Sequence, residues 1–316
     1  MLTKSEGKEV SLVIEREGRE LEVQVTPAVV DSSVIAYEEN GYGYLQLSSF
    51  SENSGADVES ALKRFVQAGE TKIILDLRDN GGGYLSAAMD IAKCFLPKGT
   101  VVFQAEERSG ERKKYKLEED YEPFAFDQIV ILMNQNTASA SEALISALDD
   151  NLSDKVVLVG ETTYGKGTMQ TSVPFADGTS LKYTSAQWFS SKGKTINGVG
   201  IAPDVEISLD EARSVSMPMY SQEIEVKEDQ VAAIAKPVQI YLRFLGYGAD
   251  RSDEYFSAQS AEALRQFQSD HGLEADGVID NETAQKLVDA ASLYWNENEE
   301  QLDVQLRKAV DIINGE

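Results

Sequence analysis

Apolar and polar residues alternate along residues 9–25, with Val10, Leu12 and Ile14 at every second position. The alternation resumes in residues 21–25, after the polar stretch "REGR". A period of two is typical of strands, so this segment predicts a β-hairpin. Because two strands alone are marginally stable, we expect the hairpin to lie against another domain and to bury Val10, Leu12 and Ile14.

Strand and helix patterns then alternate through residues 42–208. The strand patterns are "GYLQLSSF", "TKIILDL", "DQIVILMN" and "KVVLVG", and the helical patterns are residues 54–68, "YLSAAMDIAKCFL" and "SEALISALDD". This order favours parallel strand pairing in an α/β domain. After Gly167 the pattern changes to β in "GTMQTSVPF" and "TSLKYTSAQWF".

The last third of the chain has a different character. Residues 209–236 are acidic, Ser-rich and without periodicity, which predicts a linker. Residues 237–290 have helical spacing and form a separate helical unit, and residues 291–316 predict a polar amphipathic helix. The expected architecture is therefore an α/β domain with a small all-α C-terminal module.

Size and charge narrow the classes of function. The chain has 316 residues, 42% of them hydrophobic, and a net charge of −25, which suits two domains with acidic surfaces. Nucleic acid is excluded as a partner because basic clusters are missing, and an anionic membrane surface is disfavoured for the same reason. The sequence contains no apolar run of membrane-spanning length, and its start lacks the features of a signal peptide.

Several catalytic chemistries are excluded by residue counts. His271 is the only histidine and lies in the C-terminal helical unit, so a Ser-His-Asp triad in the α/β domain is not expected. Cys94 is the only cysteine and fits an apolar helical pattern, as expected of a core residue. One histidine and one cysteine are too few for a His- or Cys-rich metal site, and no cofactor is predicted. "GETTYGKGT" resembles a phosphate loop, but Gly167 replaces the magnesium-binding Ser/Thr and a strand pattern follows instead of a helix. Nucleotide binding is therefore not expected.

The catalytic chemistry that remains is a serine nucleophile paired with a lysine as general base. Lys166 stands between two glycines, and a lysine that is neutral can act as a general base. The neutral side-chain amide of Gln170 could orient the Lys166 amine by a hydrogen bond, without the charge by which a carboxylate would raise its pKa. Ser139 lies where a strand pattern gives way to a helix, and Ser139-x-x-Glu142 fits a capping box. The same geometry would direct the Ala140 amide and the helix dipole at a developing oxyanion.

Four motifs together resemble the carboxyl-terminal processing peptidases, also called tail-specific proteases. They are "DLRDNGGG" at 76–83, "TASASE" at 137–142, "GETTYGKGTMQ" at 160–170 and "GIAPDV" at 200–205. The resemblance implies a catalytic domain of the crotonase/Clp-protease type, a Ser/Lys dyad, and cleavage of proteins near their C-termini. A two-residue insertion in "DDNLSDK" lengthens the segment between the serine and the lysine.

The resemblance also implies a role for each site residue. Ser139 is the expected nucleophile, Lys166 the general base and Gln170 its orienting partner. The oxyanion amides are expected at Ala140 and at a glycine of the 81–83 run, with Gly82 preferred. Asp150, at the end of the same helix, matches an acid with a supporting structural role.

The domain organisation follows from the same resemblance. Residues 1–30 are interpreted as the last strands of a PDZ domain, and residues 31–208 as the peptidase domain. Residues 237–290 resemble a peptidoglycan-binding-like module, through the motifs "YLRFLGY" and "AEALRQFQSDHGLEADGVIDNETAQKL". The implied location is extracytoplasmic. The implied partners are protein or peptide substrates, with peptidoglycan or a regulatory protein at the module; a homodimer is left open.

Two other functions stay open at this point. The chain could be an inactive or regulated scaffold that binds cell wall or protein partners through its C-terminal module. It could also be a crotonase-like acyl-transfer enzyme. The presence of Ser139, Lys166 and Gln170 together disfavours both alternatives, since neither needs a Ser/Lys pair.

Overall fold

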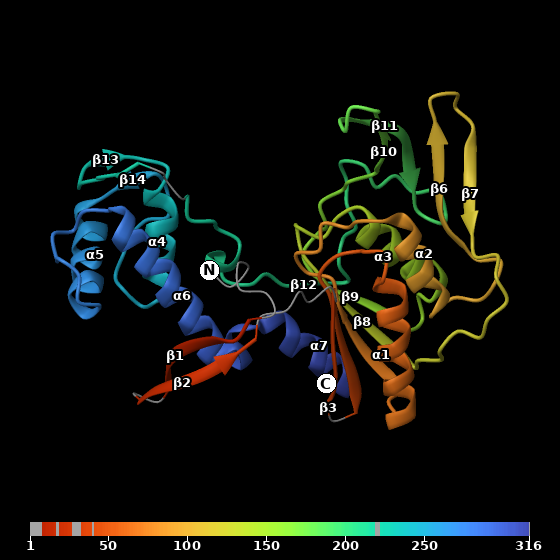
Figure 1. Cartoon of the computed structure of the whole chain (residues 1–316), viewed down its shortest axis with the longest axis horizontal. Coiled ribbons are helices and arrows are strands. Elements are labelled where there is room, and N and C mark those ends of the chain that lie inside the picture. The colour runs from red at the N-terminus through yellow and green to blue at the C-terminus, as the bar shows by residue number, and fades with distance from the viewer. Residues whose placement is uncertain (1–7, 17–18, 27–32, 40, 219–221, 316) are drawn as a thin grey trace.

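The computed structural model describes the chain except residues 1–7, 17–18, 27–32, 40, 219–221 and 316. It forms an α/β lobe and a smaller helical lobe, and two helices near the C-terminus run between them (Figure 1). The predicted fold class, an α/β domain with a helical C-terminal module, is confirmed. Within the described residues, every helix is too short or too polar to cross a membrane.

The α/β lobe is built on a six-stranded sheet. Its strands, in spatial order, are β12 (Val205–Glu206), β9 (Val156–Gly160), β8 (Gln128–Met133), β5 (Lys72–Asp76), β4 (Tyr42–Leu47) and β3 (Val34–Glu39). All neighbours pair in parallel except β3 and β4, which form an antiparallel pair. The carboxyl ends of β5, β8 and β9 therefore meet at one edge of the sheet, where or just after which the first three motifs begin.

Helices cover both faces of this sheet. One face packs against α1 (Ser54–Ala68), α2 (Leu85–Lys93) and α3 (Ala140–Asn151). The other face packs against α7 (Val304–Asn314), whose Ala309 and Ile313 are buried against strand residues such as Ile74 and Val130. Two-sided burial explains why β5 and β8 are almost continuously apolar rather than alternating. The helix that supplies the second cover comes from the far end of the chain.

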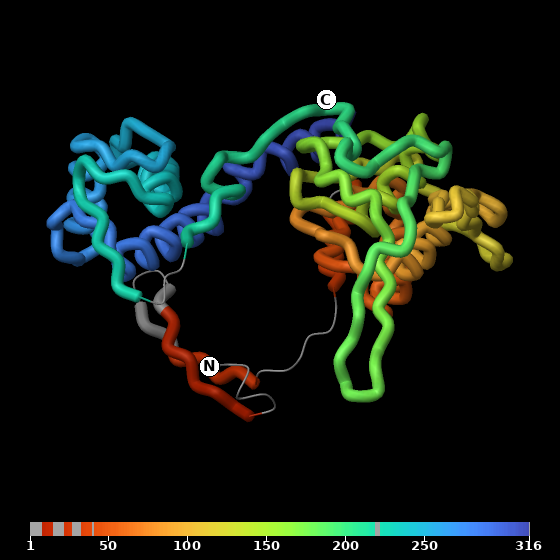
Figure 2. The backbone as a smooth tube through the Cα atoms, turned by 90° about the horizontal axis from the view of Figure 1, so that it is seen from above, coloured from red at the N-terminus to blue at the C-terminus, as the bar shows by residue number. Residues whose placement is uncertain are grey.

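A four-stranded antiparallel sheet projects from the lobe. Its order is β10 (Thr168–Pro174), β11 (Ser180–Phe189), β6 (Val101–Glu107) and β7 (Arg112–Lys116). The β10–β11 hairpin extends well beyond the helices (Figure 2). It begins directly after the Gly165–Gly167 segment, so the lysine of the third motif lies at the base of this arm.

The helical lobe contains α4 (Ala235–Phe244), α5 (Ala258–Asp270) and the first part of α6 (Asn281–Leu302), with two-residue strands β13 (Gln230–Val231) and β14 (Tyr255–Phe256). The segment expected to be a linker partly belongs to this core, because Ala212 and Val226 are buried in it and a short 3-10 helix, η2, spans Glu211–Arg213. The boundary at residue 290 also differs: α6 continues to Leu302, and α7 follows after Asp303.

The N-terminal hairpin is formed by β1 (Val10–Arg16) and β2 (Arg19–Val25), as the alternation predicted. The expected burial is not observed, however. Val10, Leu12 and Ile14 are only half-buried and belong to none of the hydrophobic cores, while Val13 is 67% exposed. The hairpin lies apart from the α/β lobe (Figure 2). The side chain of Leu21 and residues 1–7 and 27–30 lie outside the described residues, so the PDZ interpretation stays a prediction.

The docking of α7 predicts a large effect for one buried side chain. Ile313 is 1% exposed against the sheet, and Ile313→Ala should lower the free energy of unfolding by about 2–5 kcal/mol because it leaves a cavity. Arg307→Ala, an exposed change on the same helix, should cost less than about 0.5 kcal/mol. Urea denaturation followed by circular dichroism measures both. Equal free energies of unfolding for the two variants would mean that packing of α7 on the sheet does not stabilise the α/β lobe.

Candidate active site

Ser139 is the residue that caps α3 at its N-terminus. Its backbone has φ 61° and ψ −113°, and positive φ is rare for residues other than glycine. Such a conformation costs about 1–3 kcal/mol and persists only where the surroundings hold it, most often at functional sites. The serine at this helix start is therefore held in an unusual backbone conformation by its neighbours.

The other two hydroxyl residues of the motif have structural contacts. Thr137 Oγ1 donates to the carbonyl of Leu77 at 2.8 Å, and Ser141 Oγ donates to the carbonyl of Asn80 at 2.9 Å. Both side chains are fully buried, whereas Ser139 is partly exposed. These bonds fasten the start of α3 to the end of β5, and they leave Ser139 as the accessible hydroxyl of the three.

The Glu142 carboxylate is the central polar group of the site. It is fully buried and accepts hydrogen bonds on both oxygens. Its four donors are the Ser139 amide (2.8 Å), the Lys166 amide (2.8 Å), the Gly165 amide (2.7 Å) and the Thr163 hydroxyl (2.6 Å). One side chain thus joins the residue predicted as nucleophile to the backbone of the residue predicted as base.

Further bonds fix the backbone around Lys166. Its carbonyl accepts from Trp188 Nε1 at 2.9 Å, and the Gly167 amide donates to Asn197 Oδ1 at 3.2 Å. Both flanking glycines approach other backbone closely: a Cβ on Gly165 would lie 2.8 Å from Gly200 N. The lysine side chain is half-buried, and among the described residues its ammonium forms neither a hydrogen bond nor an ion pair.

The backbones of Ser139 and Lys166 are joined through Glu142, but the structure as described shows no bond between the predicted catalytic side chains. No hydrogen bond joins Ser139 Oγ to Lys166 Nζ within the described part of the chain. Gln170 lies exposed on β10, where the pairing with β11 shifts register, and among the described residues its amide forms no hydrogen bond with the Lys166 ammonium. The roles of these three side chains therefore stay predictions.

The glycine turn, residues 79–83, packs directly against the helix start. Gly82 has φ 96°, and a Cβ there would lie 2.7 Å from the Ala138 carbonyl oxygen and 2.9 Å from the Ala140 amide nitrogen. The Ala140 amide donates to no described group. The Gly82 amide, however, already donates to Asn80 Oδ1 at 2.9 Å. The expected pair of oxyanion amides is close in space, but one of them is occupied in this conformation.

Asn80 organises the glycine turn from inside. Its side chain is fully buried, its Nδ2 donates to the Leu47 carbonyl at 2.7 Å, and its own carbonyl accepts from the Ala138 amide at 2.9 Å. Asp79, with φ 59°, is held by Asn134, whose Nδ2 donates to its carboxylate at 2.9 Å. The turn thus has fixed contacts with β4, β8 and α3.

Asp150 lies near the other end of α3, and its expected supporting role stays a prediction. Its carboxylate accepts from the Ser191 hydroxyl at 2.8 Å and from the Lys192 amide at 3.1 Å. Burial raises the pKa of this carboxyl, but hydrogen bonds from Ser191, Ser190 and Lys192 and the charge of Lys194 outweigh it, so the pKa is lowered overall. The charged carboxylate anchors the loop that follows β11.

Two residues of this site were missed from the sequence. Glu142 was expected only as one half of a helix cap, and Asn80 was expected only as part of a turn. The signal for Glu142 was the spacing Ser139-x-x-Glu142, which indicates the cap but not the three donors from residues 163–166. Those donors come from a loop more than twenty residues later in the chain.

Replacing the Glu142 carboxylate by an amide should loosen the site. In Glu142→Gln, an NH2 group would face the amide donors of Ser139 and Lys166, and we expect a loss of about 2–4 kcal/mol in the free energy of unfolding. Glu161→Gln in the same loop is the matched control, since that side chain is half-exposed and accepts a hydrogen bond from the Ser208 hydroxyl rather than from the site. Chemical denaturation of both variants tests this, and similar stabilities would show that the carboxylate is not what joins the two segments.

Two segments of the chain match known protein families. Residues 41–207 match the family described as "Peptidase family S41", and residues 234–287 match "Putative peptidoglycan binding domain". A probable CtpA-like serine protease of Staphylococcus epidermidis (strain ATCC 12228 / FDA PCI 1200) is 33% identical over 298 residues, which are 92% of this chain and 60% of that protein. The carboxy-terminal processing protease CtpA of Bacillus subtilis (strain 168) is 29% identical over 313 residues, 98% of this chain and 65% of that protein.

Solved structures show the same fold. The photosystem II D1 C-terminal processing protease superposes with a TM-score of 0.50 at 28% identity, covering 64% of this chain and 56% of that one. A putative S41 protease from Bacteroides fragilis has a TM-score of 0.50 at 21% identity, which shows the fold alone. The chain spans about three fifths of the length of the first curated relatives. Since the peptidase match alone covers more than half of its residues, the chain belongs to peptidase family S41.

Proposed function

We propose that this chain is a serine endopeptidase that cleaves protein substrates near their C-termini through an acyl-enzyme at Ser139, with Lys166 as the general base. The observation that carries the proposal is the buried Glu142 carboxylate, which accepts hydrogen bonds from the amides of both residues. A purely structural cap would need only the contact with Ser139. The additional bonds hold the lysine segment beside the serine.

The surroundings of Ser139 suit a nucleophile. The residue stands at the positive end of α3, and the Ala140 amide points from the first turn with no other partner among the described residues. Attack by Oγ on a peptide carbonyl would place the developing negative charge near this amide. The second proposed donor is Gly82, whose N–H would have to leave Asn80 Oδ1 to serve the oxyanion.

The surroundings of Lys166 suit a base that must lose its proton. Its ammonium has no carboxylate partner among the described residues, and such a partner would hold it charged. The Lys166 backbone is held on both sides, by Glu142 and by Trp188, and its side chain would bring Nζ to Ser139 Oγ. Nζ would take the hydroxyl proton during attack and return it to the leaving amine, and water would then hydrolyse the acyl ester. Gln170, at the base of the β10 arm, would orient the amine through its amide.

The proposed setting follows from the relatives and the second domain. The relatives are named serine proteases and carboxy-terminal processing proteases, and the C-terminal module matches a putative peptidoglycan-binding domain. We propose an extracytoplasmic location, with the module as the contact to peptidoglycan or to a regulatory protein. A homodimer stays an open prediction.

The test is hydrolysis of β-casein and of a fluorogenic peptide with a free C-terminus. Ser139→Ala and Lys166→Arg should each lower kcat/KM on the order of 10³-fold, because one removes the nucleophile and the other keeps the base charged at any usable pH. A fluorophosphonate probe should label Ser139 in the unaltered chain. Ser172→Ala and Lys192→Arg are the matched controls, because both side chains are exposed, and they should retain full activity.

Two results would contradict this function. Comparable rates for Lys166→Arg and the unaltered chain would exclude the dyad. Absence of Ser139-dependent hydrolysis, together with retention of the chain on purified peptidoglycan, would favour the scaffold function instead.

A further inference from the structure

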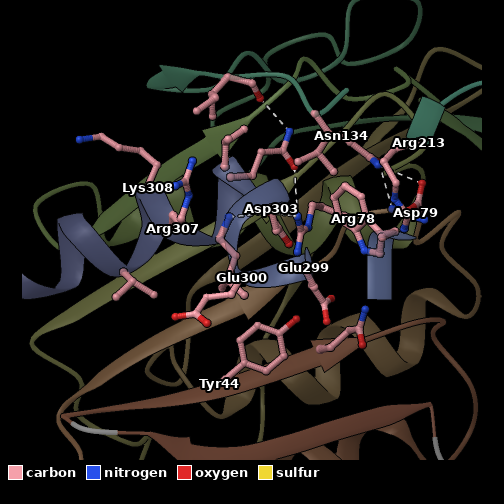
Figure 3. Close-up of a pocket in the computed structure, with 18 of the residues that line it drawn as sticks. Tyr44, Arg78, Asp79, Asn134, Arg213, Glu299, Glu300, Asp303, Arg307 and Lys308 are labelled. Carbon is pink, nitrogen blue, oxygen red and sulfur yellow. Dashed lines mark hydrogen bonds and ion pairs between the residues drawn. The ribbon is translucent and has the colours of Figure 1, made fainter. Parts of the chain in front are cut away.

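The Arg78 side chain binds two buried carboxylates that are far apart in the sequence, Asp76 and Asp303. Figure 3 shows Arg78 beside Asp303. Its Nη2 donates to Asp76 Oδ2 at 2.6 Å, and its Nη1 donates to Asp303 Oδ1 at 2.8 Å. The three side chains are 11%, 0% and 5% exposed, for Arg78, Asp76 and Asp303 respectively. Asp303 is therefore a buried ionic partner of the first motif, although it lies almost a hundred residues beyond the segment that matches the peptidase family.

Asp303 is also the junction between two helices. Its amide donates to the Glu299 carbonyl at 2.8 Å at the end of α6, and its carboxylate accepts from the Leu306 amide at 2.8 Å at the start of α7. Next to it, Gln305 Nε2 donates to the Ile207 carbonyl at 2.7 Å, while its Oε1 accepts from Arg78 Nη1 at 3.3 Å. The position of Asp303 is thus fixed by the helices and not by Arg78 alone.

Arg78 leads directly into the glycine turn. The next residue, Asp79, has the strained φ of 59°, and the one after it, Asn80, holds the Gly82 amide. The turn is in tight contact with the helix start, because a Cβ on Gly82 would lie 2.7 Å from the Ser139 Cβ. A small displacement of Arg78 would therefore change the distance between the glycine amides and the proposed oxyanion. Misplacement by an ångström can cost two orders of magnitude in rate.

We propose that Asp303 is a positioning residue for the reaction: it holds Arg78, and through Arg78 it sets the place of the glycine turn against Ser139. This inference rests on the proposed peptidase function. It assigns a role at the active site to a residue of the C-terminal helices. Asp303 does not touch the reacting atoms.

The variant that tests the role is Asp303→Ser. Serine is a good helix N-cap, so α7 keeps its start, but the side chain is too short to reach Arg78. With a fluorogenic peptide, kcat should fall by about tenfold while KM changes by less than about twofold, because only the placement of the oxyanion donors is altered. Asp303→Asn, which retains both the cap and the reach to Nη1, should restore kcat to within about threefold.

A second measurement does not depend on catalysis. Hydrogen–deuterium exchange of a peptide covering residues 79–84 should be faster in Asp303→Ser than in the unaltered chain, and Asp303→Asn should restore the protection. Ile313→Ala is the control, because it weakens the other end of α7 against the sheet without contacting Arg78. It should lower the melting temperature at least as much as Asp303→Ser while leaving kcat and exchange at 79–84 unchanged.

The outcomes separate the two claims. If the unaltered chain shows no Ser139-dependent hydrolysis, the proposed function fails, and exchange at residues 79–84 alone decides whether Asp303 positions the turn. If hydrolysis is present but Asp303→Ser changes neither kcat nor exchange, the positioning role is wrong. The role is equally overturned if Ile313→Ala reproduces both effects, since loss of stability would then explain them.

Discussion

The structure of the site depends on one buried carboxylate. Removing Glu142 from water is costly unless its oxygens find donors, and here four donors offset that cost. Each donor belongs to a segment that the catalytic proposal needs in place: the strained serine, the lysine between its glycines, and Thr163. Thr163 Oγ1 in turn accepts from the Ile201 amide at 2.8 Å, which brings the closing motif into the same network. This network joins three of the four motifs, and the glycine turn is attached to it through the Asn80 carbonyl, which accepts from Ser141 Oγ and the Ala138 amide.

The sheet places these segments at a common edge. Parallel strands β5, β8 and β9 end side by side, so the loops after them carry the glycine turn, Ser139 and Lys166 respectively. The same parallel arrangement buries the strands on both faces, and α7 closes the face that α1 to α3 leave uncovered. Helix α7 is thereby part of the α/β lobe and not an appendage of the helical module.

Local pattern predicted the strand and helix order of residues 42–190, because each period reflects which face of an element is buried. It could not say what covers each face. The continuous apolar runs in β5 and β8 required a second cover, but nothing in residues 304–314 marks that helix as the one that supplies it. The N-terminal hairpin shows the opposite failure: its alternation correctly gave two strands, yet burial depends on a packing partner, and Val10, Leu12 and Ile14 are only half-buried. Likewise Ser139-x-x-Glu142 gave the cap but not the loop that the carboxylate binds.

The buried charges around Arg78 bear on why α7 sits where it does. Two carboxylates share one guanidinium, so the cluster carries one excess negative charge, and its side chains are largely buried. The Tyr44 hydroxyl also donates to Asp76, at 2.8 Å. Such clusters add little net stability compared with apolar packing, since desolvation consumes most of the attraction. Apolar contacts such as Ile313 can hold a helix on a sheet, but they tolerate sliding and rotation. A guanidinium with directional bonds to Asp303 does not. The ionic contact therefore fixes the register of α7 against β5, and with it the single position in which the first motif meets the end of the chain.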